Sequence, residues 1–195
     1  MTQQTPLPQT PLQSPEPAPR KPNPWKDMLE TILLAVIIFV IIQTLTVRVK
    51  VFNISMRPTL EEGYMVLVNK WAYRSQAPQR GDVVVFHNQG QNNQDYIKRV
   101  IGIGGDNVEV RGRETYVNGI QLTEPYILER PNWTGSWTVP EGKIFVLGDN
   151  RNNSSDSQDW GFVDQTWVVG KAILIYFPFN HIQVLNHPDL LAANP

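Results

Sequence analysis

The sequence predicts a mainly β, antiparallel domain preceded by one transmembrane α-helix. Residues 32–47 carry no charge, and residues 32–42 are uninterrupted hydrocarbon side chains. A helix of roughly 20 such residues is what the apolar core of a bilayer requires. After residue 47, short apolar runs, some of period two, are separated by turns rich in Gly, Pro and Asn. That pattern is typical of antiparallel strands.

The composition divides the chain into three parts. Residues 1–24 form a Pro/Gln-rich tail with too few apolar side chains to fold, so we expect disorder there. Residues 25–49 form the anchor helix, which we expect to be retained because no small-residue cleavage site follows it. Residues 50–195 form the β-rich domain, with a small β extension at about residues 106–141. Basic residues flank the helix on both sides and leave its orientation open, while the length of the following domain favours export.

Turn signals mark the individual strands. Val47, Val49 and Val51 alternate with basic residues, and Asn118-Gly119 indicates a tight hairpin. Further strands are predicted at residues 83–86, 96–103, 115–117, 120–122, 143–147 and 167–177. After residue 60 we expect no helix of useful length, apart from one or two turns within residues 61–72.

The composition also excludes several classes of function. The formal net charge of −1 gives no reason to expect a nucleic-acid partner. The absence of cysteine removes disulfides, thiol nucleophiles and thiolate metal sites. His87, His181 and His187 do not form an H-E-x-x-H motif, so a catalytic zinc is not expected. We therefore expect no metal and no other cofactor; the oligomeric state is left open.

Ser55 and Lys98 are the first two candidates for chemistry. Ser55 lies where a strand meets a turn limited by Pro58, which lets its hydroxyl project, although such serines more often cap the backbone. Lys98 would share a strand face with Tyr96 and Val100, and these neighbours would desolvate its amine. Lowering a lysine pKa from about 10.4 by roughly two to three units produces a working base. The alternative is a lysine that extends its ammonium to solvent at a strand edge.

A third candidate segment is the dense polar run of residues 148–159, which follows an apolar strand and precedes Trp160-Gly161-Phe162. By itself it is a solvated loop of Asx and Ser turns. Polar loops held by apolar segments on both sides are, however, also where catalytic groups are often found.

Together these segments resemble bacterial-type signal peptidase I, the Ser/Lys-dyad membrane proteases that remove signal peptides from exported proteins. The matching stretches are Ser55-Met56-x-Pro58-Thr59-Leu60, Arg80-Gly81-Asp82-Val83-Val84-Val85-Phe86, Asp95-Tyr96-Ile97-Lys98-Arg99 and Gly148-Asp149-Asn150-Arg151-x-x-Ser154-x-Asp156-Ser157. They stand in the family's order behind an amino-terminal anchor, and the resemblance covers about residues 25–180. It implies a signal-peptidase-like antiparallel β-sheet catalytic domain that cleaves after small residues at Ala-x-Ala-like sites.

The resemblance implies a role for each site residue. Ser55 would be the nucleophile and Lys98 its general base, oriented by Ser154. Asp149 and Arg99 would form a structural ion pair. Pockets that admit only small side chains would be walled by Met56, Leu60, Tyr96 and Ile97.

The chain departs from the family pattern at three places, one of which is the short stretch between Asp106 and Glu141, where other members carry a large inserted subdomain. Asn53-Ile54 replaces the usual Ser-Gly before the nucleophile, and the Asn53 amide would join the Ser55 N–H as an oxyanion donor. Gln158 replaces an arginine, so we expect Asp156 to accept hydrogen bonds from backbone donors instead.

The implied partners are preprotein signal peptides and a lipid bilayer. The expected location is the cytoplasmic (inner) membrane, crossed once, with the catalytic domain on the extracytoplasmic side; a thylakoid-type membrane also fits. A Ser-His-Asp hydrolase using His87 lacks the G-x-S-x-G motif. A self-cleaving repressor of the same Ser/Lys clan would need a DNA-reading domain. A catalytically weak or inactive tethered domain that binds peptides stays open, given Asn53-Ile54 and Gln158.

Overall fold

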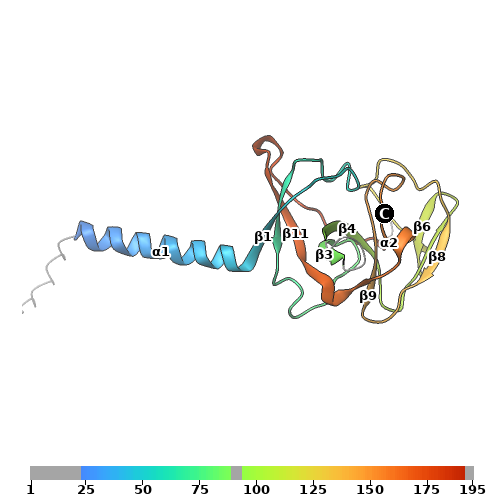
Figure 1. Cartoon of the computed structure of the whole chain (residues 1–195), viewed down its shortest axis with the longest axis horizontal. Helices are drawn as coiled ribbons and strands as arrows, with labels where there is room; N and C mark the ends of the chain where they lie inside the picture. The colour runs from blue at the N-terminus through green and yellow to red at the C-terminus, as the bar shows by residue number, and fades with distance from the viewer. Residues whose placement is uncertain (1–22, 89–93, 192–195) are drawn as a thin grey trace, which may run out of the picture. The chain divides into compact units, whose positions relative to one another are not determined.

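The computed structural model describes residues 23–88 and 94–191, so residues 1–22 of the predicted tail lie outside it. The apolar segment forms helix α1 (Pro24–Leu45), shown in blue in Figure 1. Its 22 residues span about 33 Å at 1.5 Å per residue, which is enough to cross a bilayer core. Among the described residues, it is the one helix with the length and composition to do so.

The main sheet is antiparallel throughout. Seven strands follow the order β1-β2-β11-β3-β4-β9-β10, and β12 pairs with β11. Their bounds are β1 (Thr46–Lys50), β2 (Met65–Asn69), β3 (Val83–Asn88), β4 (Gln94–Ile103), β9 (Lys143–Leu147), β10 (Val163–Asp164), β11 (Val168–Phe177) and β12 (Gln183–Val184). Three short helical elements connect them: α2 (Ser157–Trp160), η1 (Gln165–Trp167) and η2 (Phe179–His181).

A second sheet, in the order β7-β6-β5-β8, forms the β extension. Its strands are β5 (Asn107–Arg111), β6 (Glu114–Val117), β7 (Ile120–Gln121) and β8 (Gly135–Thr138). The β6–β7 hairpin turns at Asn118 and Gly119, whose φ values of 52° and 80° are those that an Asn-Gly hairpin turn requires. In Figure 1 the extension lies at the end of the domain opposite β1.

The prediction of helical turns within residues 61–72 is wrong, because Met65–Asn69 forms strand β2. This strand lies between β1 and β11 and pairs with both. Val66 and Val68 are fully buried on one of its faces. Backbone pairing on two sides and burial of two β-branched residues outweigh the weak local preference for helix.

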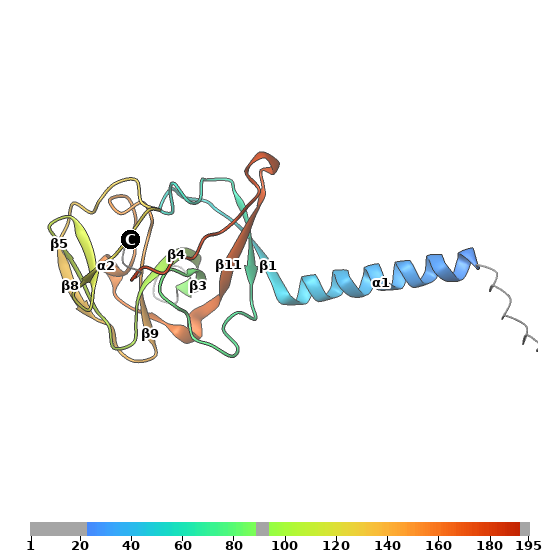
Figure 2. The ribbon, with the colours of Figure 1, turned by 180° about the vertical axis from the view of Figure 1, so that it is seen from behind.

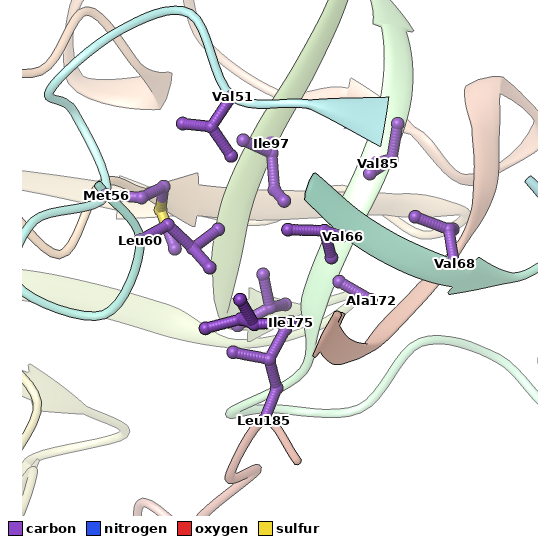
Figure 3. Close-up of a cluster of buried hydrophobic side chains, with 11 residues drawn as sticks. Val51, Met56, Leu60, Val66, Val68, Val85, Ile97, Ala172, Ile175 and Leu185 are labelled. Carbon is purple, nitrogen blue, oxygen red and sulfur yellow. The ribbon is translucent and has the colours of Figure 1, made fainter. Parts of the chain in front are cut away.

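Met56 and Leu60, from the loop that carries Ser55, pack in an apolar cluster (Figure 3). The labelled members are Val51, Met56, Leu60, Val66, Val68, Val85, Ile97, Ala172, Ile175 and Leu185. They come from β2, β3, β4 and β11 and from the loops next to them, and Val47 and Val49 of β1 pack against them. The cluster therefore joins these five strands into one support for the site.

Candidate active site

Ser55 lies in the loop between β1 and β2, and this loop is held on two sides. Met56 and Leu60 are fully buried in the cluster of Figure 3. On the other side, the Ser55 carbonyl accepts a hydrogen bond from the Asn150 N–H at 3.0 Å, and the Asn150 amide donates to the Ile54 carbonyl at 3.1 Å. These contacts fix the position of a serine that is only 5% exposed.

Lys98 reaches Ser55 from the middle of β4. Its Nζ donates a hydrogen bond to Ser55 Oγ at 2.6 Å, although the two residues are 43 positions apart. The lysine is 1% exposed, and Tyr96 and Val100 on the same strand face pack in a neighbouring apolar cluster. The structure thus brings together the candidate nucleophile and the candidate base.

Burial is the main influence on the Lys98 amine, and it lowers the pKa to about 8. The carboxylates of Asp156 and Asp149 act in the opposite direction. At pH 7 roughly one amine in ten is then neutral, against about one in 2,500 for an ordinary lysine. The amine therefore has access to the unprotonated form that a general base needs.

Asn53 also contacts the nucleophile. Its Oδ1 accepts hydrogen bonds from Ser55 Oγ at 2.8 Å and from the Ser55 N–H at 3.2 Å. The side-chain oxygen, not the NH₂ group, therefore faces Ser55. Because Asn53 is exposed to solvent, its amide has room to turn.

Gly148 brings the polar loop against both serines. A Cβ at this position would lie 2.2 Å from Ser154 Oγ and 2.4 Å from the Ser55 carbonyl oxygen, which is too close for any side chain. Glycine is thus required by close packing. Ser154 is buried here, and within the described residues no hydrogen bond joins its hydroxyl to Lys98.

Asp156 is fully buried and bonds to backbone donors. Its carboxylate accepts hydrogen bonds from the Gly148 N–H at 2.9 Å and from the Gln158 N–H at 3.3 Å, and the second bond caps α2. Burial raises the pKa of Asp156, while these donors and the nearby Lys98 charge oppose that rise. The carboxylate therefore holds the polar loop in shape without an arginine partner.

Arg99 and Asp149 form a buried bidentate pair. Arg99 Nε and Nη2 each donate to one carboxylate oxygen of Asp149 at 2.8 Å. Asp149 also accepts a hydrogen bond from the Thr59 hydroxyl at 2.5 Å. The pair thus connects β4, the polar loop and the loop that carries Ser55.

A second buried pair, Arg151 with Glu124, was not found from the sequence. Arg151 pairs with Glu124 from the β extension, and also donates to the Thr115 hydroxyl at 2.9 Å and the Gly148 carbonyl at 3.1 Å. The one indication in the sequence that Arg151 has a role at the site was its position in the polar motif, two residues after Asp149. Nothing near Glu124 in the sequence marked it as the partner.

A cavity of about 1020 Å³ is lined in part by Asn53, which contacts Ser55, and by Ile97, which directly precedes Lys98. It is lined by Val47, Arg48, Val49, Lys50, Val51, Phe52, Asn53, His87, Gln94, Asp95, Tyr96 and Ile97. Of the four wall residues expected from the sequence, Tyr96 and Ile97 line this cavity. Met56 and Leu60 lie in the apolar cluster instead and are fully buried.

His87 does not take the place of Lys98. It pairs with Asp95, which lies directly across from it on β4, and both side chains are about half exposed. Among the described residues, the hydrogen bonds of the Ser55 hydroxyl are to Lys98 and Asn53. The geometry therefore favours a Ser/Lys arrangement over a Ser-His-Asp triad.

Several known proteins are similar in sequence to this chain over most of its length. The family described as "Signal peptidase, peptidase S26" matches residues 25–177. "Signal peptidase I" of Leptolyngbya laminosa is 38% identical over 94% of this chain and 96% of its own. "Probable signal peptidase I-1" of Synechocystis is 41% identical over 80% and 86%, and "Signal peptidase IB" of Staphylococcus aureus is 35% identical over 84% and 97%. A crystal structure of a signal peptidase I from Enterococcus faecalis V583 aligns with a TM-score of 0.46, with 38% identity, over 49% of this chain and 97% of that one.

Proposed function

The chain belongs to the signal peptidase family, peptidase S26, and we propose that Ser55 and Lys98 are the dyad with which this single-pass membrane protein cleaves signal peptides. The observation that carries the proposal is the 2.6 Å contact between Ser55 Oγ and a buried amine whose pKa burial lowers to about 8. The reaction is serine endopeptidase chemistry, and the proposed mechanism uses no metal or cofactor.

In the first half of the reaction, neutral Lys98 accepts the Ser55 proton as Oγ attacks the scissile carbonyl carbon. The resulting ammonium then gives that proton to the departing amine as the C–N bond breaks, which leaves an acyl-enzyme. In the second half, Lys98 takes a proton from water, whose oxygen attacks the ester. The proton returns to Ser55 Oγ as the signal peptide leaves.

We assign stabilisation of the oxyanion to the Ser55 N–H and the Asn53 amide. In the free enzyme the Ser55 N–H donates to Asn53 Oδ1, so the substrate carbonyl has to replace that oxygen. A half-turn of the exposed Asn53 amide then presents its NH₂ group to the same point. Ile54, where the family usually has glycine, takes no part in this exchange.

Two unpaired strand edges favour an extended peptide as the substrate. Within residues 23–88 and 94–191, β1 is the outer strand of the main sheet, with one neighbour, β2. In the same part of the chain, β4 pairs with β9 only from Arg99 onward, so its residues 94–98 have a partner on one side, β3. Both edges belong to segments that line the large cavity, where a peptide can pair with them as an added strand.

The same geometry accounts for selection of Ala-x-Ala-like sites. In an extended peptide, side chains one and three residues before the cleaved bond point to the same side. On the face that carries Ile97 they would meet this side chain, above a core already filled by Met56 and Leu60. Bulky side chains would therefore be excluded at both positions.

We place the anchor in the cytoplasmic membrane, with the catalytic domain on the extracytoplasmic side, where exported preproteins emerge. A thylakoid-type membrane is the alternative, and two of the relatives come from cyanobacteria. Fractionation of the two membranes, combined with protease protection of the domain in sealed vesicles, distinguishes these locations.

The decisive experiment compares the full-length wild type with Lys98→Arg and Ser55→Ala on a preprotein that has an Ala-x-Ala site. Both variants should lose cleavage, because guanidinium remains protonated and alanine has no nucleophile. Cleavage by Lys98→Arg at neutral pH would rule out the dyad. Tight binding of the preprotein with no cleavage by the wild type would instead identify a peptide-binding domain.

A further inference from the structure

Residues 185–191, here called the C-terminal strap, follow β12 and lie beyond the part of the chain that the family matches. In Figure 2 this dark red segment runs from the hairpin after β11 across the domain toward the β extension. Leu185 anchors its start in the cluster of Figure 3, and its N–H donates to the Ile173 carbonyl at 3.0 Å. Leu190 is fully buried in a second apolar cluster, and its carbonyl accepts from the Thr123 N–H at 3.2 Å.

Between these two anchors, the strap contacts Arg99. The Arg99 Nη1 group donates to the Asn186 carbonyl at 3.3 Å and to the Gly81 carbonyl at 2.9 Å. The remaining guanidinium contacts go to Asp149 and to the ring of Tyr126, whose centroid lies 4.0 Å away. The strap therefore supplies one of the two main-chain acceptors that hold the guanidinium in place.

Gly81 fixes the strap against the same site. A Cβ at Gly81 would lie 2.2 Å from the Pro188 carbonyl oxygen, and its φ of +88° also favours glycine. The residue whose carbonyl accepts from Arg99 is thus in direct contact with the strap. Any displacement of the strap has to change the surroundings of Arg99.

His187 is the side chain that fastens the middle of the strap. Its Nδ1 accepts a hydrogen bond from the N–H of Val83, the first residue of β3, at 3.3 Å. Asp82, at 3.8 Å, and the cations of Lys171 and Arg99 also face the ring. Burial and the Lys171 charge lower the pKa of His187, with Asp82 opposing them, so the ring is neutral at pH 7 and Nδ1 is free to accept.

We propose that His187 is a positioning residue for the catalytic lysine, acting through the strap, Arg99 and Asp149. This inference rests on the proposed role of Lys98 as the base. Arg99 directly follows Lys98 on β4 and compensates the charge of Asp149. That charge acts on the Lys98 amine and raises its pKa. If the strap loosens, Arg99 is held less firmly, Asp149 is less compensated, and a smaller fraction of Lys98 is neutral at pH 7.

The test compares two full-length variants in detergent micelles. His187→Asn keeps an acceptor near the position of Nδ1, while His187→Leu removes it and keeps apolar volume. We expect the ionisation near pH 8 in the pH profile of kcat/KM to move upward by about half to one unit in His187→Leu, which lowers kcat/KM at pH 7 about 3- to 10-fold. KM should not change, and His187→Asn should match the wild type.

A folded His187→Leu protein with the wild-type pH profile would overturn the inference, because a merely structural strap alters thermal stability without moving the ionisation. If His187→Leu does not fold, His187→Gln, whose amide reaches the position of Nε2 rather than Nδ1, takes its place and has to show the same shift. Ser55→Ala and Lys98→Arg are assayed in parallel. Activity in either of those two would refute the dyad itself, whereas an unshifted profile with both inactive would refute only the role of His187.

Discussion

Lys98 and Arg99 are neighbours on β4 and are equally buried, yet the protein treats their charges in opposite ways. Burial alone would lower the pKa of both. Arg99 faces Asp149 and has its pKa raised, whereas Lys98 faces a neutral hydroxyl and has its pKa lowered to about 8. Adjacent residues of a strand point to opposite faces, so one strand supplies both environments. Ion pairing, not depth of burial, determines which cation keeps its proton.

The contrast between Arg99 and Lys98 also distinguishes a residue that stabilises the fold from one that can react. A paired buried charge is costly to break, because the partner that remains is left buried and uncompensated. An unpaired buried amine opposes folding as long as it is protonated in the unfolded chain. We therefore expect the buried Arg99–Asp149 pair to stabilise the fold. The buried Lys98 amine should destabilise it, and the same burial makes the amine reactive.

The largest expected effect comes from Lys98→Met. Activity should fall by at least about 10³-fold, because no base remains. The free energy of unfolding at pH 7 should stay the same or rise, by at most about 3 kcal/mol, because the lowered pKa means that the unfolded chain binds more protons between pH 8 and 10.5. Preprotein cleavage and urea denaturation measure the two quantities. A clear loss of stability would show that the amine supports the fold.

Gly148→Ala should have the next largest effect on activity. The added methyl group would displace Ser55 or Ser154, and a shift of about 1 Å at a reacting group can cost on the order of 10²-fold in rate. We expect kcat to fall by about that factor and KM to change little. Gly112→Asn is the control, since Gly112 has φ of 58° and open space around it. Wild-type turnover by Gly148→Ala would show that the contact with Ser55 is not needed.

Asp149→Asn tests whether the buried pair of Arg99 and Asp149 stabilises the fold. It leaves the Arg99 cation buried without a carboxylate, and the free energy of unfolding should fall by about 3–5 kcal/mol. Chemical denaturation of the full chain measures this loss. The half-exposed pair of Arg57 and Glu61 provides the control, because Glu61→Gln should change stability little. Similar losses in both variants would contradict the distinction between buried and exposed pairs.

His87→Ala should have the smallest effect. The pair of His87 and Asp95 is exposed, and the Ser55 hydroxyl has other hydrogen-bond partners. We expect kcat to stay within about twofold of the wild type. Loss of cleavage would return His87 to the candidates for general base.

Short-range patterns were sufficient for much of the fold and for part of the site. The apolar run predicted α1, Asn118-Gly119 predicted the β6–β7 turn, and alternation on β4 placed Lys98 among apolar neighbours. Strand β2 was missed because its pairing with β1 and β11 comes from residues distant in the sequence. For the same reason Arg151 had no visible partner.

The contacts of the C-terminal strap could not be predicted from the sequence for a different reason. Residues 185–191 have no periodicity, and their contacts with Arg99, Val83 and Thr123 are made by single carbonyl groups and one imidazole ring. Every residue type has a main-chain carbonyl group, so the sequence does not show which of these groups make a contact. The expected positions of Met56 and Leu60 were affected similarly, since the motif identifies apolar residues without showing whether they line a cavity or fill the core beneath it.

The central claim is that Lys98 loses its proton near pH 8, and direct titration of the amine tests it. Full-length protein labelled with ¹³C at lysine Cε would be followed by NMR from pH 6 to 11, with Lys98→Arg identifying the signal by its disappearance. One lysine should titrate near pH 8. If the Lys98 signal titrates near pH 10.5, the ordinary value for a lysine, the amine cannot be the base and the proposed dyad is wrong.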